Sequence, residues 1–121
     1  MGRANHIHIL THNPSSTFLE VTGPDHDPSY IYNATHVGQL FFNQDLISEV
    51  EALDPYTSNQ QPLTQNSVDL YLTQEAATSD PFVNYTLIGD TVADGILAWI
   101  TIGIDTTEDA AVKTPFYLSP G

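Results

Sequence analysis

The sequence predicts an all-β protein with one or two short helices, and three stretches support this prediction. Apolar and polar residues alternate in residues 6–10 and 82–88, which is the spacing of a half-exposed β-strand. Residues 96–104 form the most apolar run and are rich in β-branched side chains, as in a strand buried on both faces. With 121 residues, 40% of them hydrophobic, the chain is long enough for one domain with a modest core.

The first expected strand, at residues 6–10, carries a His-x-His pair. In a strand, His6 and His8 point to one face with Cα atoms about 6.5–7 Å apart. Ile7 and Ile9 point to the other face, where we expect them to pack into the core. This spacing lets two imidazoles converge on one metal ion, but two ordinary polar strand positions would give the same pattern.

Positive charge is scarce in this chain. Arg3 and Lys113 are its only basic residues, against fifteen acidic ones, and the net charge is −13. Arg3 stands three residues before His6, where a cation beside a metal would neutralise an anionic substrate or intermediate. A surface arginine is the alternative interpretation.

The same charge balance excludes several classes of partner. Nucleic-acid binding is disfavoured because phosphate contacts need lysine and arginine, and an acidic membrane surface is likewise a poor partner.

No stretch approaches the roughly 18 apolar residues of a membrane span. The chain has no cysteine, so disulfide and thiolate chemistry is excluded.

Between residues 13 and 42 the sequence predicts mainly extended structure. The expected elements are a turn at 13–16, strands at 17–22, 30–37 and 38–42, and a loop at 23–29. In the strand at 38–42, Gln39 and Phe41 share one face. The five elements lead directly into the first helix.

A helix is expected after Asn43, which is a good N-cap residue. Asp45 lies in its first turn, where the helix dipole favours negative charge. The apolar stripe of this helix consists of Leu46, Ile47, Val50 and Leu53. Asp54-Pro55 is expected to end it.

The second half of the chain alternates loops with short elements. A polar loop at 57–66 precedes a short helix within 67–77, capped by Asn66 or Ser67. In the strand at 82–88, Val83, Tyr85 and Leu87 are expected to point inward, and Asn84 and Thr86 outward. Residues 89–95 form a loop, and Trp99 in the last strand is expected in the core. Residues 106–121 form a proline-bearing tail.

Three segments resemble one known family. Residues 2–8, Gly-Arg-Ala-Asn-His-Ile-His, resemble the Arg-x-x-His-Ile-His segment of intradiol ring-cleavage dioxygenases, closest to the extracellular fungal branch. Residues 36–42 resemble the strand with a pocket-lining glutamine, and residues 89–100 resemble the family's closing strands. The resemblance implies that residues 1–105 are the C-terminal portion of a β-sandwich of the intradiol dioxygenase type, followed by the tail at 106–121.

The resemblance also implies a site and a reaction. His6 and His8 would be ligands of a non-haem Fe(III), Arg3 would stabilise charge developing on the substrate, and Gln39 would position the ring or oxygen. The family cleaves catechol-type aromatics between their two hydroxyls with O₂, giving muconate-type diacids. Its two tyrosine ligands precede the matched segment, so we expect this chain to be the C-terminal part of such a protein.

Two glycosylation sequons, Asn33-Ala34-Thr35 and Asn84-Tyr85-Thr86, together with the fungal-type resemblance predict an extracellular parent protein.

Two other interpretations stay open. The first is a non-catalytic remnant or structural module that assembles with a second copy, because unpaired sheet edges invite pairing. The second is a cupin-type metal site, which also uses His-x-His on a strand but places a glutamate soon after it. Here Glu20 lies twelve residues past His8.

Overall fold

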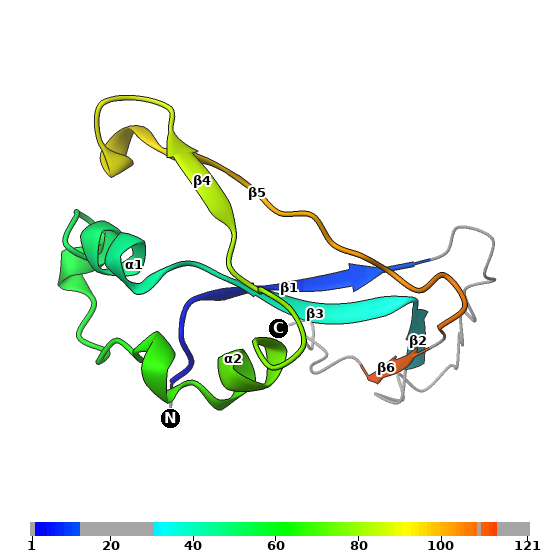
Figure 1. Cartoon of the computed structure of the whole chain (residues 1–121). Helices are drawn as coiled ribbons and strands as arrows, with labels where there is room; N and C mark the ends of the chain where they lie inside the picture. The colour runs from blue at the N-terminus through cyan, green and yellow to red at the C-terminus, as the bar shows by residue number, and fades with distance from the viewer. Residues whose placement is uncertain (1, 13–30, 109, 114–121) are drawn as a thin grey trace, which may run out of the picture. The chain divides into compact units, whose positions relative to one another are not determined.

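The structure is a computed structural model that describes residues 2–12, 31–108 and 110–113 (Figure 1). Its strands are β1 (His6–Thr11), β2 (Ile31–Ala34), β3 (His36–Phe41), β4 (Asn84–Leu87), β5 (Ile96–Trp99) and β6 (Ala110–Lys113). Its α-helices are α1 (Gln44–Glu51) and α2 (Leu70–Glu75), and short 3-10 helices lie at Tyr56–Ser58, Asn66–Val68 and Val92–Asp94. Small two-stranded sheets with two short helices agree with the predicted all-β, partial β-sandwich fold. The turn, strand and loop predicted between residues 13 and 29 lie outside the described residues.

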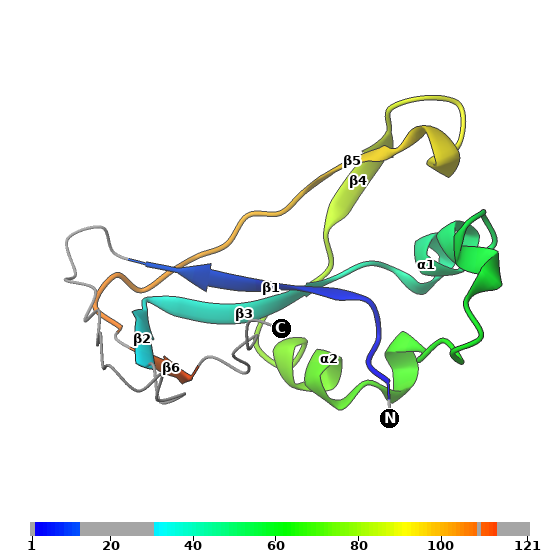
Figure 2. The ribbon, with the colours of Figure 1, turned by 180° about the vertical axis from the view of Figure 1, so that it is seen from behind.

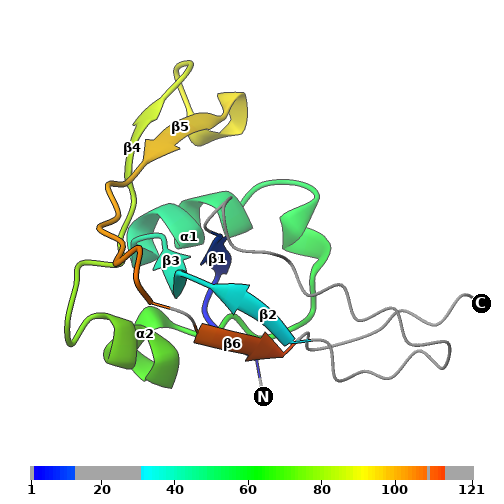
Figure 3. The same ribbon diagram turned by 90° about the vertical axis from the view of Figure 1, so that its right-hand side faces the viewer.

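The strands pair as β1 with β3, β2 with β6, and β4 with β5. The chain divides into two units, one comprising Met1–His8 and Gly38–Ile102 and the other Ile9–Val37 and Gly103–Gly121. In the second unit β2 and β6 run antiparallel side by side, with Ile31 opposite Lys113 (Figure 3). The segment 106–121, predicted as a tail, therefore contains a strand. None of the helices in the described part of the chain has the length and hydropathy needed to cross a membrane.

The core of the first unit forms where the N-terminal segment meets β3 and α2. Ala4, Phe41 and Leu72 are buried together, and Phe82 packs against them. In Figure 2 the segment before β1 runs beside the start of α2. The prediction that Ile7 packs into the core is wrong, because its side chain is 49% exposed and Ala4 takes the core position instead.

Helix α1 forms for the local reasons that the sequence indicates. The Asn43 side-chain carbonyl accepts a hydrogen bond from the Leu46 N–H at 2.8 Å, which confirms the predicted N-cap. Leu46 and Ile47 are buried, as the predicted apolar stripe requires. The helix ends at Glu51, before the predicted stop at Asp54-Pro55.

The second helix is confirmed, but its predicted cap is wrong. Asn66 and Ser67 belong to a separate 3-10 turn, and α2 begins after Asp69, whose carboxylate accepts from the Leu72 N–H at 3.0 Å. The capping position is thus three residues later than Asn66. This shift places a carboxylate at the start of α2, where it also reaches the N-terminal segment of the chain.

The β4–β5 hairpin is more exposed than the sequence predicts. Val83 is buried and Asn84 exposed, as expected, but Leu87 is exposed instead of pointing inward. The strand predicted at 96–104 is confirmed only over Ile96–Trp99, and its predicted burial is wrong, because Leu97 and Trp99 are 59% and 52% exposed. The physical reason is that β5 pairs only with β4 among the described strands, and burial of both faces of a strand requires layers on each side.

Candidate functional site

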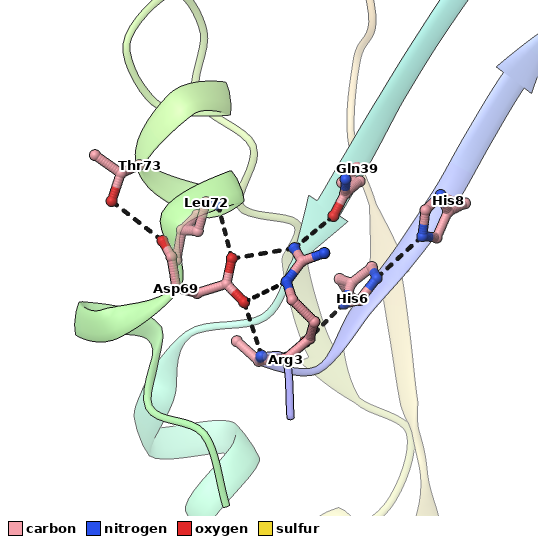
Figure 4. A network of polar contacts seen from close by, with 8 residues as sticks. Arg3, His6, His8, Gln39, Asp69, Leu72 and Thr73 are labelled. Carbon is pink, nitrogen blue, oxygen red and sulfur yellow. Dashed lines mark hydrogen bonds and ion pairs between the residues drawn. The ribbon is translucent and has the colours of Figure 1, made fainter. Parts of the chain in front are cut away.

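Arg3 is held by a carboxylate and an amide from two other segments of the chain (Figure 4). Its Nε donates to Asp69 Oδ2 at 2.7 Å, and its Nη2 donates to Asp69 Oδ1 at 3.0 Å and to Gln39 Oε1 at 2.8 Å. Two parallel N–H···O bonds to one carboxylate fix the plane of the guanidinium. The structure thus brings together Arg3 and Gln39, both predicted site residues, around Asp69, which the sequence analysis did not single out.

Asp69 is a fully buried carboxylate with hydrogen bonds on both oxygens. Besides the two from Arg3, it accepts hydrogen bonds from the backbone N–H of Ala4 at 2.9 Å and of Leu72 at 3.0 Å. The Arg3 hydrogen bond is the main cause that holds the pKa of this carboxyl far below its usual range. The Leu72 and Ala4 N–H groups lower the pKa further, against the opposing effect of burial. Asp69 is therefore ionised at every pH at which a protein is ordinarily studied.

The face of the Arg3 guanidinium is also covered. Its Cζ atom lies 4.1 Å from the centroid of the Tyr71 ring, which is a cation–π contact. Among the described residues no group accepts a hydrogen bond from Nη1, so its two N–H groups are available to a ligand. The side chain remains 31% exposed. Arg3 is thus fixed on one edge and one face, and open at one nitrogen.

His6 and His8 lie close enough to share an ion. Their Nε2 atoms are 3.1 Å apart and their ring centroids 4.9 Å apart. His6 Nδ1 lies 2.7 Å from the Ala4 carbonyl oxygen, which only accepts, so in the neutral ring Nδ1 carries the proton and Nε2 accepts the hydrogen bond from His8 Nε2. Two nitrogens that each lie about 2.1 Å from one ion, at a right angle, are about 3.0 Å apart. The observed spacing matches two adjacent positions in a metal coordination shell.

The His6 side chain is more closely packed than the His8 side chain. The His6 ring lies 5.7 Å from the buried Phe41 ring and is partly buried, whereas His8 is exposed. Ala4 connects both halves of the site, because its N–H donates to Asp69 while its carbonyl accepts from His6. A hydrogen-bonded partner on the distal nitrogen is the usual arrangement for a metal-binding histidine.

The described residues bring together no set of possible metal ligands larger than a pair. Across residues 2–12, 31–108 and 110–113, no group of three or more His, Cys, Asp and Glu side chains is placed to hold a metal ion. The resemblance implies Fe(III), which prefers anionic oxygen donors, so a ferric site would need further ligands besides His6 and His8.

A groove of about 980 Å³ opens beside the Arg3 guanidinium. Its lining includes Arg3, Tyr71, Glu51, Gln61 and Leu63, but neither His6 nor His8. The groove gives small molecules access to Arg3.

The fold is similar to that of an intradiol ring-cleavage dioxygenase. The similar solved structure is that of the intradiol ring-cleavage dioxygenase from Tetranychus urticae. It matches 70% of this chain with a TM-score of 0.55 and 16% sequence identity. The match covers 45% of that protein, so this chain spans less than half of its length. At this identity the likeness concerns the fold. No family model and no curated protein matches the chain.

Proposed function

We propose that this chain forms the histidine-bearing part of an intradiol-type dioxygenase that cleaves catechol-type aromatics with O₂ at a non-haem Fe(III). The main support is the His6–His8 pair, whose Nε2 atoms are 3.1 Å apart and whose His6 tautomer is set by the Ala4 carbonyl. The dioxygenase-like fold and the fixed arginine nearby in the sequence agree with this function. The substrate would be a small aromatic diol, and the product a muconate-type diacid.

Each predicted site residue has a defined task in this proposal. His6 and His8 would hold the metal through their Nε2 atoms, with His6 oriented by its Nδ1–H bond to Ala4. When bound, Fe(III) would supply Lewis-acid chemistry that activates the aromatic diol toward O₂. The ligands that complete the site are the two tyrosinates implied by the family resemblance, which come from outside the described residues.

Arg3 stabilises negative charge on the substrate as the reaction proceeds. Its Nη1 N–H groups are preorganised, because Asp69 and Gln39 hold Nε and Nη2 and Tyr71 covers one face. A donor that is already fixed needs little reorganisation when charge develops. Gln39 must present its oxygen to Arg3, which only donates, so its amide N–H₂ is the group that contacts a substrate oxygen.

Iron and catechol binding test this proposal on the isolated chain. Fe(III) and catechol are added to the purified protein, and bound iron and the visible catecholate-to-iron absorption band are measured. The His6→Ala and His8→Ala variants should lose both signals, whereas His12→Ala, which removes a histidine outside the pair, should retain them. Equal iron and absorption in all three variants would refute the ligand assignment.

A second candidate is a non-catalytic module that assembles with a second copy of the chain. The incomplete ligand set among the described residues favours it, since two imidazoles hold Fe(III) weakly without anionic donors. Sedimentation of metal-free protein over a range of concentrations distinguishes the two. A stable dimer that binds no iron and no catechol would support the module.

A further inference from the structure

The β4–β5 hairpin places a glycosylation sequon directly opposite the only tryptophan of the chain. In its antiparallel register Asn84 pairs with Trp99, and Thr86 pairs with Leu97. Directly paired residues project to the same face of a two-stranded sheet, and alternate residues share that face. The acceptor asparagine and the hydroxyl residue of Asn84-Tyr85-Thr86 therefore lie on the face that carries Leu97 and Trp99.

This face is strongly exposed and apolar. Leu97 and Trp99 are more than half exposed, and so is Ile88, which continues the same alternation at the end of the hairpin. Asn84 and Thr86 are exposed beside them. Soluble proteins rarely leave a contiguous apolar patch of this kind uncovered without a functional reason.

We propose that Asn84 carries an N-linked glycan whose first N-acetylglucosamine covers Trp99. The Cβ atoms of directly paired residues are about 4.5–5.5 Å apart, so a sugar on Asn84 Nδ2 reaches the indole. The C–H face of the sugar removes apolar indole and Leu97 surface from water, while its hydroxyls and amide stay solvated. The glycan thus shields the patch and gives the hairpin a polar surface.

The modification is a glycosyl transfer with a defined donor. Asn84 Nδ2 forms a bond to C1 of N-acetylglucosamine from a lipid-diphosphate-linked oligosaccharide, the C1–O bond to the diphosphate breaks, and Nδ2 loses one proton. The donor is supplied in the secretory pathway. This inference does not depend on iron binding or ring cleavage, because none of Arg3, His6 and His8 contributes to this face of the hairpin.

The tryptophan itself reports whether the sugar covers it. The full chain, directed by a leader through the secretory pathway of a eukaryotic host, is analysed by peptide mass spectrometry for occupancy of Asn84. Acrylamide quenching and the emission maximum of Trp99 are then compared with those of Asn84→Gln. The glycosylated protein should show a blue-shifted emission and a lower quenching constant, and trimming the glycan to its first sugar should preserve both effects.

Asn33→Gln serves as the matched control. It removes the other sequon, whose asparagine pairs with Ala111 and not with a tryptophan, so the protection of Trp99 should persist. An unmodified Asn84 in the secreted chain would overturn the proposal. Equal quenching of Trp99 in the glycosylated protein and in Asn84→Gln would also overturn it. Protection of Trp99 in Asn84→Gln that increases with protein concentration would overturn it as well, because a second copy of the chain would then cover this face.

Discussion

Replacing Asp69 by asparagine tests whether the buried carboxylate organises the site. Removing one partner of a buried ion pair costs about 3–5 kcal/mol. Because Arg3 is 31% exposed and water can solvate it after the change, we expect a smaller loss, of about 2–3 kcal/mol. For a chain of this size each kcal/mol corresponds to about 4 °C in Tm, so Tm should fall by about 8–12 °C.

The lowered pKa of Asp69 also predicts how the stability loss of Asp69→Asn depends on pH. The pKa of Asp69 is lowered in the folded protein, chiefly by its hydrogen bond from Arg3, so its contribution to stability is present above the unfolded-state pKa of about 4. That contribution is lost as the pH falls further, toward the folded-state pKa. The stability difference between parent and Asp69→Asn should therefore be constant from about pH 5 to pH 8 and shrink below about pH 4.

Thermal and urea unfolding, followed by far-UV circular dichroism, measure both effects. Asp90→Asn is the matched control, because it removes the same charge from an exposed position of this strongly acidic chain. If Asp69→Asn loses no more stability than Asp90→Asn, the carboxylate does not hold Arg3 and the N-terminal segment in place. A loss that is independent of pH down to pH 2 would also contradict the argument.

Substitutions at three further positions probe the Arg3–Asp69 pair, the core and the first helix. Arg3→Lys should cost about 1–2 kcal/mol in urea unfolding, because a lysine cannot make both bonds to Asp69; unchanged stability would contradict this. Phe41→Ala should cost about 3–5 kcal/mol and weaken iron binding through the loss of packing on His6, whereas Phe41→Leu should keep most of both. Asn43→Ala should cost about 1 kcal/mol of unfolding free energy and Asn43→Ser much less; equal losses would refute the capping role.

Features set by neighbouring residues were predictable from the sequence. The Asn43 cap depends on residues 43–46, and the meeting of the two imidazoles depends on strand periodicity at residues 6–8. Asp69 was not found, although an aspartate three residues before Leu72 is a local capping signal. Its ion pair with Arg3 joins positions 66 residues apart, and no local pattern indicates such a pairing.

Burial was the least predictable property. Strand alternation placed Ile7 in the core and hydrophobicity placed Trp99 there, yet both are about half exposed. Whether an apolar strand residue is covered depends on which other elements pack on that face, and that is decided by distant parts of the chain. Ala4 shows the reverse: a small residue without a strong signal is buried, because the segment that carries it is held against Asp69 and Phe41.

The hydrogen bonds of the peptide groups on either side of Ala4 limit changes of chain length between Arg3 and His6. One is engaged by the helix-capping carboxylate and the other by the first imidazole, so the guanidinium and the histidine keep a fixed register along the chain. A one-residue insertion or deletion between Arg3 and His6 would break one of these two anchors. We therefore expect this segment to accept substitutions, above all at the exposed Asn5, but not a change in length.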